Sequence, residues 1–250
     1  MIAVESRVNR LPRVEVLGIG IDPVDMESAL RRIEEFIEDG RPRIVVTADS
    51  SGIVEAQSDT QWRDIMLNAD LVTPDSVGVL WACKRVGSPL PERVSGVDLV
   101  EALCKKSAEK GYRLYFLGAA PGIAQAAADK MREKYPGCTI VGARDGFFPP
   151  ADEAKVAQEI RDVKVDVLFV AMGIPKQEKF IARNLYEMAA KVSMGVGGSF
   201  DVLSGTVKRA PMLIRKMKLE WLWRLILNPR KWRKVMTLPK FVWLVSRTKR

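Results

Sequence analysis

The chain contains no histidine among its 250 residues. Histidine is the commonest general base and the commonest transition-metal ligand, and without it no Ser-His or Cys-His nucleophile system can exist. Any chemistry must therefore use carboxylates, hydroxyls, amides and cationic side chains. Groups of these types occur in short polar segments that each follow an apolar run of sequence.

The first of these segments is TPDS, in which Asp75 follows an expected strand and precedes an expected helix. In a protein without histidine, a carboxylate at the carboxyl end of a strand is the natural general base. The local sequence is equally compatible with a simpler role, in which Asp75 or Ser76 only caps the helix. Both interpretations stay open at this level.

Two further segments carry polar groups. Lys176, Gln177 and Glu178 follow the apolar run VDVLFVAMG, where they predict either a binding loop or an exposed first helical turn. Residues 195–211, GVGGSFDVLSGTVKRAP, join a glycine turn to Asp201 and then to two basic residues. Such a density of glycine indicates that the backbone comes close to another group.

The turn GAAPG at 118–122 follows a strand and could present its amides to a phosphate at a helix N-terminus. A tight strand-to-helix turn would use the same small residues. Neither this turn nor GIGID at 18–22 has the GxGxxG spacing, so a nicotinamide dinucleotide site is not predicted.

Short β-branched runs alternate with helical patterns, which predicts an α/β fold with parallel strands and crossover helices. The expected strands are residues 14–19, 44–47, 71–73, 113–117, 139–143, 165–171 and 192–195. The expected helices are residues 26–37, 76–86, 97–109, 123–134, 152–161 and 176–186. Because the carboxyl ends of parallel strands form the ligand crevice, we expect the polar loops to converge on one site.

The net charge of +9 is distributed unevenly along the chain. Residues 208–250 hold 14 Lys or Arg against one acid and four of the six tryptophans, whereas residues 1–207 hold 26 against 30. We therefore divide the chain into an α/β body, 1–207, and a basic amphipathic appendage, 208–250. Such an appendage fits an anionic membrane surface. A nucleic-acid-binding protein is the alternative, although it would leave the strand-end loops without a role.

Two more features bear on location. The longest run without a charged residue, 114–128, is 15 residues long and interrupted by glycine and proline, which is too short to span a bilayer. Three cysteines without close spacing predict a reducing, cytosolic setting instead of a disulfide framework.

The motifs together resemble the WecG/TagA/CpsF family of glycosyltransferases over about residues 13–232. The segments that carry the resemblance are TPDSVGVLWA, PERVSGVDL, YFLGAAPG, ARDGFF, GIPKQE, GVGGSFDVLSGTVKRAP and LEWLWRLILNPRKWRK. The resemblance implies a Rossmann-like, mostly parallel sheet flanked by helices, with a helical appendage that touches the membrane and completes the site. It allows a homo-oligomer.

The resemblance also implies the reaction. It is an inverting transfer of N-acetylmannosamine from UDP to an undecaprenyl-diphosphate-linked N-acetylglucosamine, with no metal and no cofactor. The enzyme would work at the inner face of the cell membrane, in wall teichoic acid or related surface-polysaccharide synthesis. Another UDP-hexose donor on the same scaffold remains the alternative.

Residue by residue, the resemblance makes Asp75 the base and places Thr47 in the same pocket. It assigns the nucleotide-sugar pocket to Gly118, Ala119, Gln177, Glu178, Gly197, Gly198 and Asp201, and expects Arg209, Arg215 and Arg224 near the diphosphate. Ser76 departs from the family, which usually has glycine there, and the difference concerns the backbone conformation of the loop. Without a metal, the charge that develops on departing UDP must be met by amides and guanidiniums.

Overall fold

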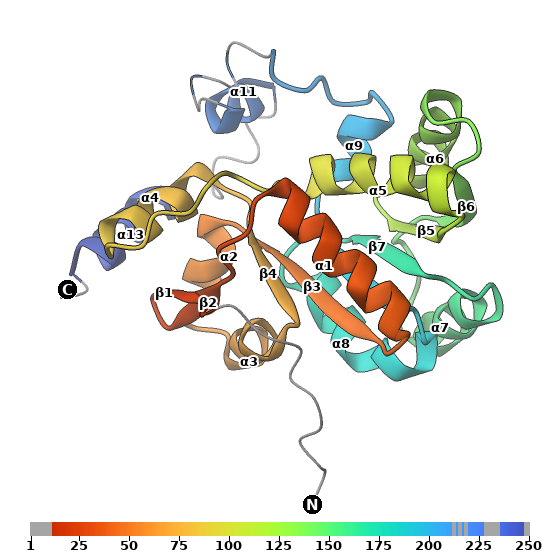
Figure 1. The fold of residues 1–250 in the computed structure, drawn as a ribbon, viewed down its shortest axis with the longest axis horizontal. Coiled ribbons are helices and arrows are strands. Elements are labelled where there is room, and N and C mark those ends of the chain that lie inside the picture. The colour runs from red at the N-terminus through yellow and green to blue at the C-terminus, as the bar shows by residue number, and fades with distance from the viewer. Residues whose placement is uncertain (1–11, 212–213, 215–216, 218–219, 228–235, 248–250) are drawn as a thin grey trace, which may run out of the picture.

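A six-stranded, all-parallel sheet forms the centre of the molecule (Figure 1). The computed structural model describes residues 12–211, 214, 217, 220–227 and 236–247. The sheet order is β4-β3-β8-β7-β5-β6. Its strands are β3 (Arg43–Ala48), β4 (Leu71–Pro74), β5 (Arg113–Gly118), β6 (Thr139–Arg144), β7 (Val167–Ala171) and β8 (Val192–Gly195). The expected parallel α/β architecture is confirmed.

Helices cover both faces of this sheet. One face carries α1 (Met26–Asp39), α5 (Gly96–Lys110), α6 (Ile123–Lys134) and α9 (Ser199–Leu203). The other carries α2 (Ser50–Glu55), α3 (Thr60–Asn68), α4 (Val77–Arg85), α7 (Glu153–Asp162), α8 (Lys176–Met188) and α13 (Thr237–Arg247). A 3-10 turn, Pro150–Asp152, precedes α7, and α11 (Glu220–Leu227) follows the body. The layers are those of a doubly wound fold.

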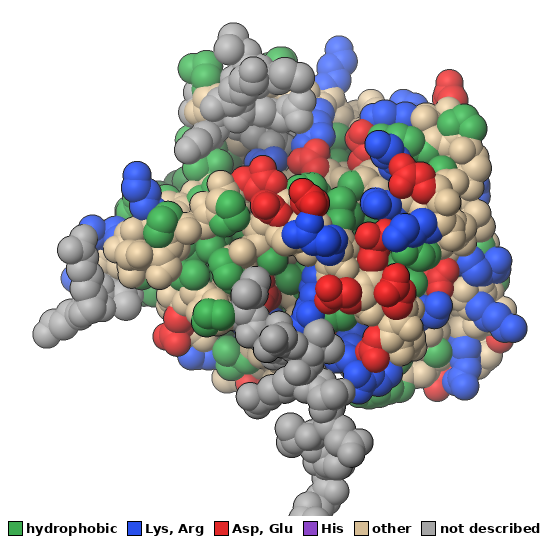
Figure 2. Space-filling view, viewed as in Figure 1, with side chains coloured by type: hydrophobic (Ala, Val, Ile, Leu, Met, Phe, Trp, Pro, Cys, Tyr) green, Lys and Arg blue, Asp and Glu red, His purple; other side chains and the backbone are tan. Residues whose placement is uncertain are grey.

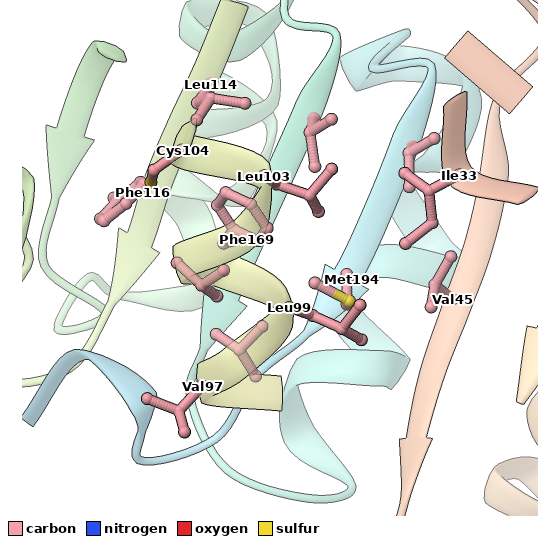
Figure 3. Close-up of a cluster of buried hydrophobic side chains, with 14 of the residues drawn as sticks. Ile33, Val45, Val97, Leu99, Leu103, Cys104, Leu114, Phe116, Phe169 and Met194 are labelled. Atoms are coloured by element: carbon pink, nitrogen blue, oxygen red, sulfur yellow. The ribbon is translucent and has the colours of Figure 1, made fainter. Parts of the chain in front are cut away.

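The core divides as the strand period of two requires. Phe116 and Phe169 point to the α1–α5–α6 side, where Phe116 stacks on Phe200 with ring centroids 4.7 Å apart (Figure 3). Their neighbours Leu117 and Leu168 point to the opposite side, under α7 and α8. Both faces of the sheet are therefore buried, and for this reason the sequences of the strands are continuous apolar runs.

One expected strand is wrong. Residues 14–19 form no strand of the main sheet but the start of an antiparallel hairpin, β1 (Val14–Val16) and β2 (Ile19–Ile21). The turn residues Leu17 and Gly18 both have positive φ, 54° and 76°, which suits a tight two-residue hairpin. The expected helices 26–37, 76–86, 97–109, 123–134, 152–161 and 176–186 all exist, with ends shifted by a few residues.

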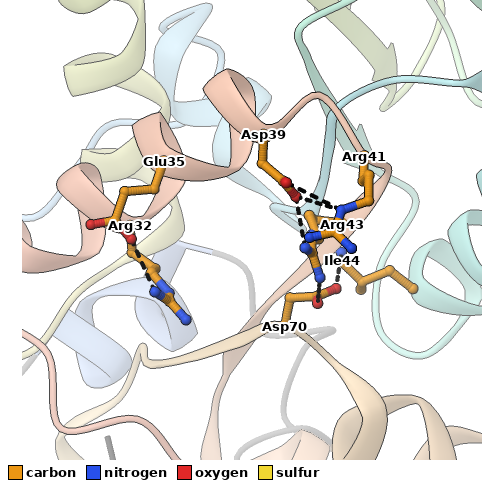
Figure 4. A network of polar contacts seen from close by, with 7 residues as sticks. All are labelled: Arg32, Glu35, Asp39, Arg41, Arg43, Ile44 and Asp70. Atoms are coloured by element: carbon orange, nitrogen blue, oxygen red, sulfur yellow. Dashed lines mark hydrogen bonds and ion pairs between the residues drawn. The ribbon is translucent and has the colours of Figure 1, made fainter. Parts of the chain in front are cut away.

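A polar network secures the amino end of the sheet (Figure 4). Asp39, at the end of α1, accepts hydrogen bonds from Arg41 (2.9 Å) and Arg43 (2.7 Å), and Arg43 also reaches Asp70 (2.9 Å). Asp70 further accepts from the Ile44 amide at 3.0 Å. The bonds from Arg41 and Arg43 lower the pKa of Asp39 from 3.8 to about 2. Their contribution to stability is therefore present above pH 3.8 and lost as the pH falls towards 2.

Asp70→Asn should lower the free energy of unfolding by about 1–2 kcal/mol, because an amide cannot satisfy Arg43 and Ile44 as the carboxylate does. Urea unfolding measures this loss. Activity per folded molecule should not change, since the network lies at the sheet end opposite the polar loops. An activity loss without a loss of stability would contradict this assignment.

Candidate active site at the carboxyl ends of the strands

Thr47 marks the point where three segments meet at the carboxyl edge of the sheet. Its Oγ1 donates a hydrogen bond to the Gly195 carbonyl of β8 at 2.9 Å, and its side chain is buried. A Cβ added to Gly96, at the start of α5, would lie 3.6 Å from both Thr47 Oγ1 and Ser199 Oγ. The threonine therefore connects β3 to β8 at the carboxyl edge of the sheet.

Asp75 follows β4 directly and is half-buried. Its amide donates to the Ala48 carbonyl at 2.9 Å, which fixes it beside the end of β3. The residue that caps α4 is Ser76, whose Oγ accepts from the Val79 amide at 3.2 Å and from the Ser50 amide at 3.2 Å. The carboxylate of Asp75 is therefore not used as the helix cap.

The serine that replaces the usual glycine causes no backbone strain. Ser76 has φ −140° and ψ 152°, an extended conformation that any residue adopts. Its hydroxyl also lies 3.1 Å from the Ser50 hydroxyl, so the substitution ties the start of α4 to the start of α2.

A second carboxylate stands at the neighbouring strand end. Asp49 follows β3 as Asp75 follows β4, and its Oδ1 accepts from the Gly52 amide and the Ser51 hydroxyl, both at 2.7 Å. This geometry makes Asp49 the cap of α2. Its position just after an expected strand, 44–47, was the only part of this signal that the sequence offered.

The segment PERVSG also reaches this edge. The Val94 amide donates to the Pro74 carbonyl at 2.9 Å, so the half-buried Arg93 lies beside the end of β4. Sequence reasoning used this segment as a motif but named no residue in it. A guanidinium here is a second cationic candidate for a diphosphate.

Gln177 holds two loops at once. Its Oε1 accepts from the amides of Gly173 and Gly197, each at 3.0 Å, and its Nε2 donates to Glu178 at 2.7 Å. Both side chains are fully buried. The interpretation of this segment as an exposed first helical turn is wrong for Gln177 and Glu178, although Lys176 is exposed.

Gly118 and Ala119 lie where β5 leaves the sheet. Gly118 has φ +126°, and an added Cβ would come within 2.5 Å of the Ala171 carbonyl oxygen. The Ala119 amide donates to that oxygen at 2.7 Å, and the Gly146 amide donates to the Ala119 carbonyl at 3.1 Å. Close packing of backbones alone therefore requires glycine at 118, and a role in ligand binding stays a prediction.

The glycine turn at 197–198 leads directly into a helix. Gly197 has φ +52°, and α9 begins at Ser199. Asp201 lies in α9, where its carbonyl accepts from the Val207 amide at 2.9 Å and its side chain stays half-buried. Gly198 is exposed beside it.

Of the three arginines expected near the diphosphate, Arg209 is the one whose side chain the structure describes. Its Nη2 donates to Asp98 Oδ1 at 2.6 Å, and Asp98 also accepts from Ser95 Oγ, the cap of α5, at 2.5 Å. Sequence reasoning did not find Asp98. Arg215 lies outside the described residues; Arg224 belongs to α11, but its side chain lies outside the description too.

A hollow of about 500 Å³ opens beside Arg209, between α5, α6 and α9. Its lining is Val97, Glu101, Lys130, Met131, Glu133, Lys134, Val202, Leu203 and Arg209. The lining combines apolar side chains with charged side chains of both signs. Arg209 is thus part of the wall of this hollow.

The sheet order places the predicted residues in one row: Asp75 after β4, Thr47 on β3, Gly197 after β8, Gln177 after β7 and Gly118 on β5. These residues come from five strands that are far apart in the sequence. Within the described part of the chain, no group of three or more acidic or cysteine side chains is placed to hold a metal ion. The edge offers carboxylates that are not used as helix caps, Asp75 among them, together with backbone amides and guanidiniums.

Gln177→Met should leave the amides of Gly173 and Gly197 without their acceptor while preserving side-chain volume. We expect the free energy of unfolding to fall by about 2–4 kcal/mol, because two buried donors lose their partner. Hydrogen exchange at the two glycine amides should also accelerate. Unchanged exchange at both amides would show that Gln177 does not hold the loops.

A parallel sheet with both faces covered and polar loops gathered at its carboxyl edge defines a Rossmann-like α/β protein with a ligand-binding edge. Residues 14–250 match the profile described as "Glycosyl transferase WecG/TagA/CpsF family". The chain therefore belongs to this family of glycosyltransferases, as the motifs predicted.

Curated relatives cover nearly the whole chain. A protein of Bacillus spizizenii W23 is 35% identical over 92% of this chain and 90% of its own length. A protein of Bacillus subtilis 168 is 33% identical over 83% of this chain and 80% of its own, and one of Staphylococcus aureus MRSA252 is 29% identical over 99% and 97%. All three bear the name N-acetylglucosaminyldiphosphoundecaprenol N-acetyl-beta-D-mannosaminyltransferase.

Proposed function

We propose that this glycosyltransferase moves N-acetylmannosamine from UDP to the N-acetylglucosamine of an undecaprenyl-diphosphate acceptor. The near full-length similarity to relatives named for this transfer carries the proposal. The row of loops at the carboxyl edge, with Asp75 beside the end of β3, supports it. The product would serve wall teichoic acid or related surface-polysaccharide synthesis.

In the proposed reaction, an acceptor hydroxyl loses its proton to the Asp75 carboxylate as its oxygen attacks the anomeric carbon of the donor. The new carbon–oxygen bond forms on the face opposite the departing UDP, so the configuration inverts. The bond from the anomeric carbon to the UDP oxygen breaks, and the diphosphate takes the electron pair. Arg209 and the strand-end amides would meet that charge.

The defining assay mixes the full chain with several UDP-sugars and a lipid-linked N-acetylglucosamine acceptor, then measures UDP release and product mass. We expect N-acetylmannosamine transfer to be fastest. Faster transfer from UDP-glucose or UDP-galactose would assign another donor to the same scaffold. No release with any donor would overturn the proposal.

Asp75→Asn should slow transfer by roughly 10² to 10⁴, because an amide cannot accept the proton from the acceptor. UDP binding, measured by calorimetry, should survive, since the change keeps size and hydrogen bonding. Asp49→Asn serves as the matched control at the neighbouring strand end, and it should retain turnover in the folded fraction. Turnover near that of the unaltered enzyme would remove Asp75 from the mechanism.

Transfer should persist in the presence of a chelator, and Arg209→Ala should lower it by about tenfold or more, because a guanidinium takes the place of a metal at the diphosphate. Arg209→Lys should recover only part of the rate, since an ammonium lacks the fork of donors. Activity lost to chelation and restored by magnesium or manganese would contradict this account.

We also propose that the enzyme binds an anionic membrane surface reversibly, at the inner face of the cell membrane. None of the described helices is long and apolar enough to cross a bilayer. A lipid-linked acceptor therefore calls for a surface contact near the site.

Helices α4 and α13 supply a candidate for that contact, which we call the α4–α13 face. The two helices lie side by side (Figure 1), and α13 buries Phe241 and Val245 against the body. Their outer sides leave Trp81 37% and Trp243 51% exposed. Neither helix contains an acidic residue, and together they carry Lys84, Arg85, Lys240 and Arg247.

This composition differs from the rest of the visible surface, where Lys, Arg, Asp and Glu intermingle over α1 and α5 (Figure 2). Tryptophan rings favour the headgroup region, and each Lys or Arg near an anionic leaflet adds about 1 kcal/mol. Because α4 begins directly after Ser76, Trp81 lies only five residues beyond that cap, about 7.5 Å along the helix axis.

Replacing Trp81 and Trp243 together by serine should weaken binding to anionic liposomes by about tenfold or more, because two interfacial rings are lost. Transfer to an acceptor with a short, water-soluble chain should be unchanged. Tyr186→Ser, which alters an exposed aromatic residue on α8, is the control and should bind as the unaltered chain does.

Point changes suit this test better than truncation, because removing α13 would uncover the side that Phe241 and Val245 cover. Salt should weaken the attachment. Undiminished flotation of the double variant would place the membrane contact elsewhere. Tighter binding to single-stranded nucleic acid than to liposomes would favour the nucleic-acid alternative.

A further inference from the structure

Two of the three cysteines lie together in the core, away from the row of site residues. Cys104 is on α5 and Cys138 comes just before β6, and each thiol shifts the pKa of the other. Both belong to the cluster of buried side chains under α5 and α6. Cys83 lies alone in a different cluster, under α4 and α13. Figure 3 shows Cys104 facing the strand side of α5, next to Phe116.

The surrounding backbone holds this pair in register. Ser107 lies one turn after Cys104, and its Oγ accepts from the amide of Thr139, the neighbour of Cys138, at 2.9 Å. The same hydroxyl donates to the Tyr112 carbonyl at 2.6 Å. The end of α5 and the start of β6 are thus joined independently of the thiols, so the segments that carry the two cysteines stay together while the protein is folded.

Access and charge differ between the two thiols. Cys104 is fully buried, whereas Cys138 is 8% exposed. The neighbouring Cys104 thiol lowers the pKa of Cys138 against the effect of burial, with help from Ser107 and Arg132. Cys138 and burial raise the pKa of Cys104, and the charge of Glu101 adds to this effect. Cys138 is therefore the thiol that ionises more readily, and Cys104 is the one that keeps its proton.

We propose that Cys104 and Cys138 are a peroxide-reactive dithiol that closes into an intramolecular disulfide. Three features carry the proposal: the place of both thiols in one buried cluster, the hydrogen bond from Thr139 to Ser107 beside them, and the small exposure of Cys138, 8%, where Cys104 has none. Sequence spacing did not reveal the pair, since 33 residues separate the two cysteines.

The chemistry needs hydrogen peroxide as the oxidant. The Cys138 sulfur attacks one peroxide oxygen, the O–O bond breaks, and one water leaves, which makes Cys138 a sulfenic acid. The Cys104 sulfur then attacks the Cys138 sulfur, its proton goes to the departing oxygen, and a second water leaves as the S–S bond forms. Two thiols are oxidised, and one peroxide is reduced to two waters.

The cross-link would fasten α5 to the edge strand of the sheet. The first turn of α5 carries Asp98, which holds Arg209 at 2.6 Å. Oxidation would therefore restrain the helix that positions a cationic residue of the proposed site. Thiol reductants would reverse the cross-link, because exchange with a free thiolate reopens a disulfide.

The test treats the reduced full chain with hydrogen peroxide at pH 7.5, stops the reaction with catalase, alkylates free thiols and maps peptides without reduction. We expect a peptide pair joined through Cys104 and Cys138, lighter by two hydrogen atoms and separated by dithiothreitol. Cys83 serves as an internal control. Burial raises its pKa to about 11, so it should be alkylated only after unfolding.

Two variants test the order of events. Cys104→Ser should leave Cys138 as a sulfenic acid that a dimedone probe traps, and Cys138→Ser should abolish the reaction with peroxide. The rate for the unaltered chain should rise from pH 6 to pH 8, as the thiolate forms.

Three results would overturn the proposal. They are oxidation of Cys138 no faster than that of Cys83, cross-linking only between chains, and oxidation of both thiols without a bond between them. The unaltered chain yields each of these readouts by itself, so a variant that fails to fold does not affect the test. Sugar transfer is not measured, so the outcome is independent of the proposed function.

Discussion

The amide of Gln177 lies at the middle of the carboxyl edge, where one buried oxygen accepts hydrogen bonds from the loops after both β7 and β8. Loops that leave parallel strands have no ladder partners, so their amides need another acceptor. Gln177 supplies it for two of them, and Thr47 fixes the Gly195 carbonyl of β8 from the other side. The positions of Gly197, in the middle of the row, and of α9 after it depend on these few bonds.

The electrostatics of the edge follow from how each acid is used. The Asp49 carboxylate caps α2, and the Asp98 carboxylate accepts hydrogen bonds from Arg209 and Ser95. Ser76 caps α4, so the Asp75 carboxylate does not act as the cap. A carboxylate at a strand end that does not act as a cap is suited to proton transfer, whereas an acid committed to a cap or an ion pair is suited to positioning.

Helix α4 connects the proposed chemistry to the proposed surface. Its first residue follows Ser76 directly, and its far side carries Trp81 beside α13. A short helix is rigid, so the distance between a docked membrane and Asp75 would be set by its length. Docking through this helix would therefore bring the headgroup of a lipid-linked sugar to a fixed height relative to the carboxylate.

Much of the body could be predicted from local patterns. Helices α1, α5, α6, α7 and α8 have apolar residues at helical spacing, and the central strands are continuous apolar runs because both faces are buried. The short elements were harder to predict from the sequence. The hairpin β1–β2 depends on positive φ at Leu17 and Gly18, and α2 and α9 span fewer than two turns, too few for a periodic signal. The nine-residue α3 was also not predicted.

For the site, the sequence alone determined which chemistry is available: carboxylates, amides and guanidiniums without histidine, in segments that follow strands. It also determined the family, through motifs in a fixed order. Only the tertiary structure decided what each group does. It buries Gln177 and Glu178, and it pairs Arg209 with Asp98 through a hydrogen bond. It also leaves Asp75 unused as a cap and places Cys104 and Cys138 in one buried cluster. The physical reason is that each assignment depends on a partner from a distant strand or helix, and local propensity carries no information about partners that only the packing of the sheet brings together.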